Sequence, residues 1–262
     1  MFFKKRPKKV GLALGGGAAR GVAHIGVLKA FSENNIPIDM IAGTSSGAFV
    51  GGIFASGMEI DAMIAYAEHL SWRQFAKFKL SRKGLFSGQP MEDMIRGQVG
   101  HIKFKDLKVP FSALATDLLS GEGVVLNDPE LEVAQAIRAS TSFPGVFTPT
   151  IINGRSYIDG GAAFNIPIPL LKGMGADVIV AVDVIPEVSL QVAPRNVATL
   201  VDRGLDLLLN TASKETLKEA DIVLKPIRER IDSFSVKRGP HLIELGEKAV
   251  YEQLDIIKKL VS

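Results

Sequence analysis

Two serines between two glycines form the pattern with the clearest chemical meaning in this sequence. Gly43-Thr44-Ser45-Ser46-Gly47 follows an apolar run and precedes a stretch of small residues. The pattern G-x-S-x-G between a strand and a helix is typical of a nucleophile elbow, whose tight turn exposes the central hydroxyl. We therefore predict Ser45 as a nucleophile, with Gly43 and Gly47 leaving room for the turn. The alternative is a Gly/Ser turn in which Ser45 caps the following helix.

A second glycine loop has a spacing that suits acyl transfer better than nucleotide binding. Gly15, Gly16 and Gly17 follow another apolar run and precede Arg20 at the start of a helical pattern. The backbone N–H groups of such a loop can converge on one point and form an oxyanion hole. A dinucleotide fingerprint counted from Gly15 would need glycine at Arg20, and a Walker A motif counted from Gly16 lacks its lysine. We predict an oxyanion hole here.

A serine nucleophile needs a base, and a carboxylate is the best candidate in this sequence. Asp159 ends an apolar stretch, and Gly160 and Gly161 after it permit a close approach. An ordinary Asp is a weak base, with a pKa of about 3.9, but burial raises the pKa of a carboxyl group. We predict Asp159 as the base. His24, about one helical turn beyond the glycine loop, is the alternative.

Cysteine and histidine usage excludes several classes of enzyme. The sequence has no cysteine and four histidines, so disulfides, thiolate metal sites and a Cys nucleophile are excluded. No two histidines have the spacing of the H-E-x-x-H motif of zinc hydrolases. We therefore expect no metal and no other cofactor. The lack of cysteine is compatible with a reducing compartment.

The elements that must position these residues alternate between short buried strands and amphipathic helices. This alternation predicts an α/β fold, three-layer α/β/α, with a mostly parallel central sheet and neighbouring first and second strands. That order places the glycine loop and Ser45 at the same edge of the sheet. We expect strands over 10–14, 38–42, 111–116, 121–126, 177–184 and 221–225, a hairpin over 150–158 turning at Asn153-Gly154, and helices over 18–34, 48–56, 59–70, 89–99, 131–139, 167–174, 197–218 and 241–260.

The chain of 262 residues, 47% hydrophobic, predicts one domain over 10–262 preceded by a basic arm over 1–9. The arm has five basic residues and no acid. The glycines behind it make a poor signal-peptide core, and no apolar run reaches the ~18 residues of a membrane span. We expect a cytoplasmic protein. The arm is either solvated or in peripheral contact with anionic lipid at the inner face of the membrane. Nucleic-acid binding is not expected, because no basic stripe with stacking aromatics follows.

Two apolar segments are candidates for contact with a lipid. Ser71 to Gly88 mixes aromatic side chains with Lys and Arg, and Phe143 to Phe147 forms an apolar loop. Each segment either lines an acyl pocket, touches a membrane surface or covers one side of the sheet.

Four blocks in a fixed order resemble the motifs of the patatin-like phospholipases. They are GGGAARG, GTSSG, RASTSFPGVFTP and the DGG that begins at Asp159, and the resemblance spans roughly Lys9 to Ile185. It is strongest to short bacterial members related to the catalytic domain of neuropathy target esterase. The resemblance implies a dyad of Ser45 and Asp159 and an oxyanion hole over 15–17. Arg20 matches the basic residue after the glycines, which holds that loop or a phosphate.

The resemblance also implies an activity. Family members hydrolyse acyl esters, often phospholipids or lysophospholipids, without a metal or dinucleotide. We therefore expect a serine esterase, of phospholipase or lysophospholipase type, that forms an acyl-serine intermediate on a lipid or acyl-ester substrate. The alternative is a catalytically weak lipid-binding or regulatory protein on the same fold. A homo-oligomer remains open.

Overall fold

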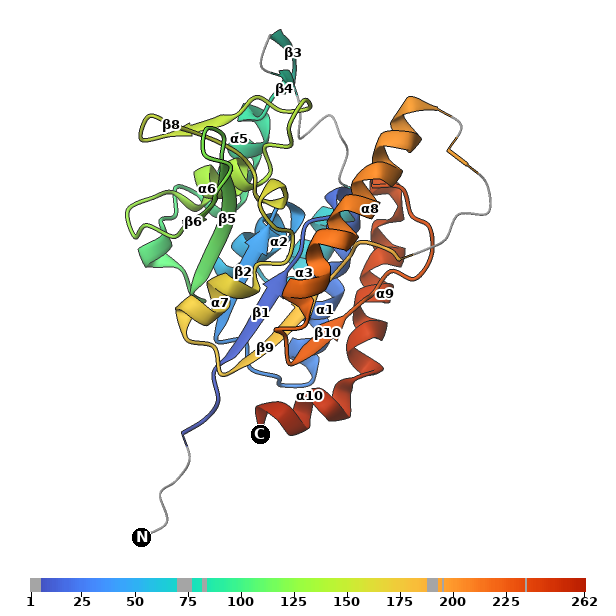
Figure 1. The fold of residues 1–262 in the computed structure, drawn as a ribbon. Coiled ribbons are helices and arrows are strands. Elements are labelled where there is room, and N and C mark those ends of the chain that lie inside the picture. The colour runs from blue at the N-terminus through green and yellow to red at the C-terminus, as the bar shows by residue number, and fades with distance from the viewer. Residues whose placement is uncertain (1–5, 70–76, 82–83, 188–192, 195, 234) are drawn as a thin grey trace.

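A mostly parallel sheet forms the centre of the computed structural model, which describes residues 6–69, 77–81, 84–187, 193–194, 196–233 and 235–262. Within these residues the sheet has eight strands in the order β10-β9-β1-β2-β5-β8-β7, with β6 beside β5 (Figure 1). Strands β10, β9, β1, β2 and β5 pair in parallel, whereas the pairs β5–β6, β5–β8 and β8–β7 are antiparallel. Their bounds are β1 (Val10–Leu14), β2 (Met40–Thr44), β5 (Phe111–Asp117), β6 (Gly123–Leu126), β7 (Thr150–Ile152), β8 (Arg155–Asp159), β9 (Val178–Val182) and β10 (Ile222–Leu224).

Helices cover both faces of this sheet, which confirms the predicted three-layer α/β/α fold. Alternate side chains of β1 enter two separate cores: Leu12 and Leu14 face α1, α2, α6 and α9, whereas Ala13 faces α7 and the end of α8. The helices are α1 (Ala23–Glu33), α2 (Ser46–Ala55), α3 (Ile60–Glu68), α5 (Gln89–Val99), α6 (Val133–Ser140), α7 (Ile168–Met174), α8 (Val197–Leu217), α9 (Gly239–Tyr251) and α10 (Leu254–Val261), with a 3-10 helix η1 (Ala18–Val22) before α1.

The strand register brings the predicted site residues to one edge. Leu14 pairs with Gly43 across β1 and β2, so the glycine loop and the serine turn leave the sheet side by side. On β5, Leu114 pairs with Thr44 and the next residue, Ala115, pairs with Asp159. Strands β2 and β8 therefore pair with successive stretches of the same edge of β5. This places Asp159, at the end of β8, beside Ser45, the residue that follows β2.

Several predicted elements differ from the observed ones. The closing helix predicted over 241–260 is two helices, because the backbone breaks near Gln253, whose side-chain amide donates to the carbonyl of Val223 at 3.0 Å. The segment Ser71 to Gly88 contains a hairpin of β3 (Lys77–Ser81) and β4 (Gly84–Ser87), and its residues 71–76 and 82–83 lie outside the described residues.

The predicted hairpin turn is confirmed. Asn153 and Gly154 connect β7 to β8 and have φ of 49° and 77°. Positive φ at both central positions is what a tight hairpin turn requires, and Asn-Gly tolerates it best. The turn places β8, and therefore Asp159, against β5.

The described part of the basic arm lies at the amino end of the strands, away from the glycine loop (Figure 1). The Arg6 guanidinium donates to both carboxylate oxygens of Asp177 at 2.9 and 2.8 Å. Lys8 Nζ donates to the carbonyl of Leu260 at 2.6 Å. Two basic side chains of the arm thus bind the protein itself, and contact between the arm and lipid stays a prediction. In the residues that the structure describes, no helix is both long and apolar enough to cross a bilayer.

Candidate active site

Ser45 occupies a strained turn between β2 and α2. It has φ 53° and ψ −122°, a backbone conformation that costs a non-glycine residue about 1–3 kcal/mol and is concentrated at functional sites. The Ser45 N–H donates to Ser140 Oγ at 2.9 Å, which ties the turn to the fully buried end of α6. A Cβ at Gly47 would collide with the carbonyl oxygen of Leu14, so glycine is needed there. The predicted strand-turn-helix context of Ser45 is confirmed.

The carboxyl group of Asp159 lies next to Ser45 and is 4% exposed. Burial raises the pKa of Asp159 to about 6, and the hydrogen bonds from the Ser45 side chain and the Gly161 N–H partly oppose this rise. The Gly161 N–H donates to Asp159 Oδ1 at 2.8 Å. At neutral pH the group is therefore ionised, and it is a stronger base than an ordinary Asp. The structure brings together the two residues predicted as nucleophile and base.

Three side chains hold the glycine loop. His24 Nε2 donates a hydrogen bond to the carbonyl oxygen of Gly15 at 2.8 Å. Asn165 binds Gly16 twice: its Oδ1 accepts from the Gly16 N–H at 3.0 Å, and its Nδ2 donates to the Gly16 carbonyl at 3.3 Å. Arg20 Nε donates to the carbonyl of Gly17 at 3.3 Å. The loop is fixed before any substrate binds.

Some backbone N–H groups of the glycine loop already have acceptors within the protein, so only the others are free to bind an oxyanion. The Gly15 N–H donates to the carbonyl of Val182 at 3.0 Å, and the Gly16 N–H donates to Asn165. Among the described residues, no acceptor binds the N–H groups of Gly17 and Ala18. The loop packs against the elbow, since a Cβ at Gly16 would lie 3.0 Å from the Ser45 Cβ. Of the three predicted glycines, Gly17 has a free donor, and Ala18 adds a second.

His24 contacts the loop rather than the serine. It is fully buried, and burial lowers its pKa to about 4 despite the opposing bond to Gly15. A neutral imidazole that donates to a carbonyl through Nε2 orients the backbone. The geometry therefore favours Asp159 over His24 as the base for Ser45.

Arg20 forms a buried ion pair with α8. Its guanidinium donates to both carboxylate oxygens of Asp206, at 3.0 and 2.6 Å, and the two side chains are almost fully buried. A bidentate pair of this kind is strong and directional. Because Arg20 also holds Gly17, it connects the glycine loop to α8. Its guanidinium charge is neutralised within the protein.

An almost wholly apolar cavity of about 520 Å³ opens at Ser45 and Asp159. It extends along α2 and is bounded by η1, α3, α8 and the loop after α6. Pockets of this size and character bind small apolar ligands. Within the described part of the chain, no group of His, Asp or Glu side chains is arranged to hold a metal ion. The apolar lining includes Val22, Ile25, Phe49, Val50, Ile53, Met58, Met63, Met91, Phe143, Val146, Phe147, Leu205 and Leu209.

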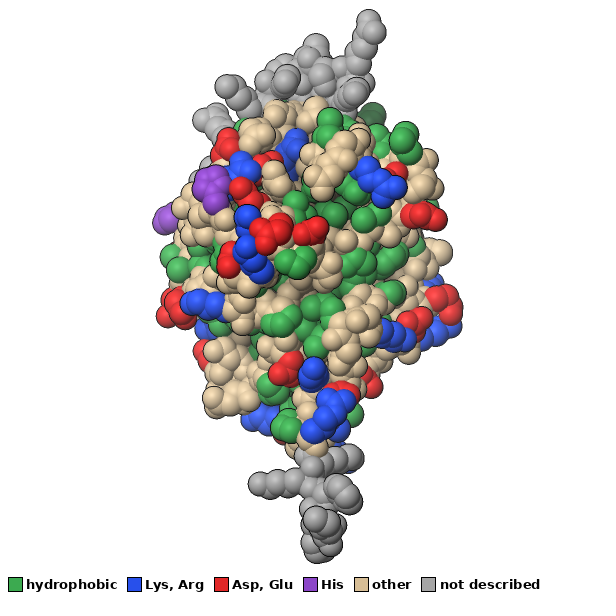
Figure 2. Space-filling model, turned by 90° about the vertical axis from the view of Figure 1, so that its left-hand side faces the viewer, with side chains coloured by type: hydrophobic (Ala, Val, Ile, Leu, Met, Phe, Trp, Pro, Cys, Tyr) green, Lys and Arg blue, Asp and Glu red, His purple; other side chains and the backbone are tan. Residues whose placement is uncertain are grey.

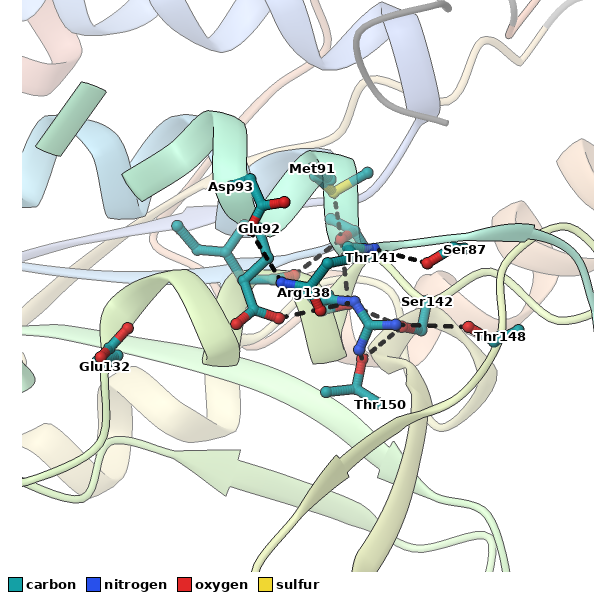
Figure 3. Close-up of polar contacts among 12 residues, drawn as sticks. Ser87, Met91, Glu92, Asp93, Glu132, Arg138, Thr141, Ser142, Thr148 and Thr150 are labelled. Carbon is teal, nitrogen blue, oxygen red and sulfur yellow. Dashed lines mark hydrogen bonds and ion pairs between the residues drawn. The ribbon is translucent and has the colours of Figure 1, made fainter. Parts of the chain in front are cut away.

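A buried polar network holds the loop at the rim of this cavity (Figure 3). Arg138 Nη1 donates to Thr150 Oγ1 at 2.8 Å, and the hydroxyls of Ser142 and Thr150 are hydrogen-bonded at 2.8 Å. The Ser142 carbonyl accepts from the Asp159 N–H at 3.0 Å. The network therefore positions both the apolar loop and the candidate base.

The apolar segments predicted to meet lipid have different places. Phe143, Val146 and Phe147 line the cavity, as one of the predicted alternatives requires. In the other segment, Phe86 packs against Phe147 with ring centroids 6.4 Å apart. Phe86 thus supports the rim from outside. Trp72 and Phe75 lie outside the described residues.

Three residues of the site were not predicted from the sequence. Ser140 anchors the elbow, Asn165 anchors Gly16, and Asp206 pairs with Arg20. Ser140 stands in the block RASTSFPGVFTP, which could have suggested a role, and Asn165 follows Asp159 closely. Asp206 lies in a long amphipathic helix and has no local signal.

Comparison with known proteins finds one matching family and several related sequences. Residues 12–172 match the model of the patatin-like phospholipase family. An uncharacterised NTE family protein of Mycobacterium tuberculosis is 39% identical over 177 residues, 66% of this chain and 48% of that protein. Lysophospholipase nte1 of Aspergillus fumigatus is 34% identical over 187 residues, 68% of this chain and 12% of that protein. This chain thus spans about half the length of the first relative and a small part of the second.

A solved structure shares the fold. VipD from Legionella pneumophila superposes with a TM-score of 0.63 and 14% identity, covering 95% of this chain and 67% of that one. At this identity the likeness concerns the arrangement of helices and strands alone.

Proposed function

This chain belongs to the patatin-like phospholipase family, and we propose on that premise that it is a lipid acyl hydrolase with a dyad of Ser45 and Asp159. One observation carries the proposal: the strained serine lies beside a buried carboxyl group, whose pKa burial raises to about 6, and both residues line an apolar cavity. A protein that only carries lipid does not need a strained serine beside a base. The proposed catalytic unit is residues 10–262.

The proposed mechanism has two half-reactions. Asp159 accepts the proton of Ser45 Oγ as this oxygen attacks the ester carbonyl, and the N–H groups of Gly17 and Ala18 donate to the resulting oxyanion. The leaving alcohol takes the proton from Asp159 and departs, so that the acyl group stays on Ser45. Asp159 then deprotonates a water molecule, which hydrolyses the acyl-serine and restores the hydroxyl.

The proposed substrate is an ester of a long acyl chain, of the phospholipid or lysophospholipid kind. The apolar cavity supports this, because burial of an acyl chain along α2 removes apolar surface from water and so favours binding. The names of the fungal relatives agree with it. Peripheral contact of the arm with anionic lipid belongs to the same proposal.

A fluorophosphonate probe tests the nucleophile. The wild-type protein is expected to be labelled on Ser45, and Ser45→Ala is expected to lose labelling and ester hydrolysis together. Ser46→Ala is the matched control, because the adjacent Ser46 hydroxyl is buried without a hydrogen-bond partner in the structure. Equal labelling of Ser45→Ala and wild type would contradict the proposal.

The substrate class is tested separately. p-Nitrophenyl esters of increasing chain length are expected to show a falling KM as more methylenes enter the cavity. Lysophospholipid and phospholipid vesicles then establish whether one or two acyl chains are accepted. A KM that does not depend on chain length would contradict acyl binding in the cavity.

A further inference from the structure

Helix α8 has two apolar faces, and among the residues that the structure describes only one of these faces is covered. Leu205 and Leu209 point inward and line the cavity, on the same side as the buried carboxylate of Asp206. Apolar side chains also lie on an outer side of the helix, at position 197, at 200 and 201, and at 207 and 208, and the helical period of 3.6 residues places them in one row. This outer stripe consists of Val197, Leu200, Val201, Leu207 and Leu208, which are 76, 60, 54, 51 and 68% exposed.

An exposed stripe of this kind is unusual on a surface helix. Such helices normally turn their apolar side to the core and their polar side to water. In α8 the charged side chain of Asp206 faces inward, where Arg20 neutralises it, and large apolar side chains face outward. An uncompensated apolar row on a surface marks a place where another apolar phase makes contact.

The stripe continues into the cavity. Val201 belongs to the stripe and also lines the cavity, so the two apolar surfaces meet at this residue. Whatever covers the stripe therefore lies against the rim through which an acyl chain enters. A surface made of the substrate itself satisfies this condition without blocking the entrance.

A second copy of this chain fits the stripe less well. A stable protein interface uses about 20–30 residues on each partner, whereas the stripe has five. The side of the molecule over β6, β8 and α6 is also a poorer candidate for lipid, because its apolar side chains are mixed with charged ones (Figure 2). Those charges include the exposed pairs of Lys103 and Lys105 with Glu130.

We propose that the outer stripe of α8 docks on the surface of a lipid bilayer and brings the cavity rim against it. The inference rests on the proposed function for its choice of partner. The Arg20–Asp206 pair joins the docking helix to the glycine loop, so docking holds the bilayer next to the oxyanion site. Apolar docking of this type withstands salt, unlike attraction between the basic arm and anionic lipid.

The test measures sedimentation of the full chain with vesicles of phosphatidylcholine and phosphatidylglycerol at low and high salt. Leu208→Gln is compared with Ile256→Gln, which removes a similar exposed side chain (56% exposed) from α10, at the far end of the molecule. The triple variant Leu200→Gln/Leu207→Gln/Leu208→Gln extends the series. None of these leucines lines the cavity.

We expect the triple variant to bind vesicles at least about tenfold more weakly at high salt, and Leu208→Gln to lose more binding than Ile256→Gln. Hydrolysis of a soluble short-chain ester should be unchanged in every variant, which shows that the site is folded. Ser45→Ala should bind vesicles as tightly as the wild-type protein. Vesicle binding therefore tests docking even if the proposed role of Ser45 in hydrolysis is wrong.

Two outcomes overturn the inference. One is vesicle binding by the triple variant as tight as that of wild type. The other is a wild-type dimer, seen by light scattering, that the triple variant dissociates, because the stripe would then contact a second copy.

Discussion

The side chain of Ser45 lies next to the carboxyl group of Asp159, although Ser45 follows β2, Asp159 ends β8, and these two strands do not pair with each other. Both strands pair with the same side of β5, one after the other: Thr44 lies opposite Leu114, and Asp159 opposite Ala115. Strand β5 therefore sets the separation between the proposed nucleophile and the proposed base, and four expected outcomes follow from the groups around them.

The pH profile of kcat/KM should fall on the acid side with an apparent pKa near 6. Burial raises the pKa of Asp159 to about 6, and only its ionised form accepts the serine proton, so kcat/KM should rise with pH through about 6 and then level off. A neutral p-nitrophenyl ester keeps substrate ionisation out of the profile. A limb near pH 4, where His24 titrates, would instead implicate the imidazole.

Asp159→Asn should inactivate the protein and stabilise it at high pH. The folded carboxyl has a pKa of about 6 against 3.8 for an ordinary Asp, so ionisation costs folding free energy that is fully felt above about pH 6 and disappears below pH 3.8. The variant should gain up to ~3 kcal/mol relative to wild type between pH 3.8 and pH 8. Urea unfolding at both pH values measures this.

The opposite titration of His24 does not disturb that comparison. Its folded pKa of about 4 lies below the ordinary 6.5, so it removes stability as pH falls from 6.5 through 4, in both proteins alike. A stability difference between variant and wild type that does not change with pH would contradict a buried charge at Asp159.

Asn165→Ala should lower kcat by about 10² with little change in KM, because the amide holds Gly16 and thereby aims the neighbouring Gly17 N–H. Steady-state kinetics on a p-nitrophenyl ester gives the two constants separately. Asn127→Ala is the matched control, since its amide binds Ser112 on the far side of β5 from the site strands. If kcat stays normal in Asn165→Ala, the loop is held without this clamp.

Breaking the Arg20–Asp206 pair should destabilise the fold strongly. Removing one partner leaves a buried charge, and Arg20→Met or Asp206→Leu should each cost about 3–5 kcal/mol of unfolding free energy. The double variant should lose much less than the sum. Lys218→Met, which removes an exposed pair with Glu215, should change little. Additive losses in the double variant would show that the two side chains are not coupled.

Much of the fold and the centre of the site could be predicted from local patterns. The turn at Ser45 has its strand before it and its helix after it, so the five residues of G-x-S-x-G and their flanks contain the information. The parallel strands β1 and β9 are apolar throughout, and β2 is apolar up to Thr44; such runs are typical of strands whose two faces are buried and are easily recognised.

The rest depends on contacts between distant parts of the chain. Ser140 and Asn165 act on backbone N–H groups far away in sequence, and no local spacing records those bonds. The break between α9 and α10 is similar, because the Gln253 side chain at this break donates to the carbonyl of Val223, which is distant in sequence. The proposed oxyanion donors could not be told apart from sequence either, because only the structure shows that the N–H groups of Gly15 and Gly16 already have acceptors.

Three side chains hold the glycine loop, and they also fix the directions of its free backbone N–H groups. His24, Asn165 and Arg20 each bind a different glycine, so the free donors already have their direction in the empty protein. The conformational entropy that is lost when these N–H groups are oriented is lost on folding, and it is not lost again each time a substrate binds. Under the proposed mechanism, every substrate molecule would therefore meet N–H groups that already point in the same direction.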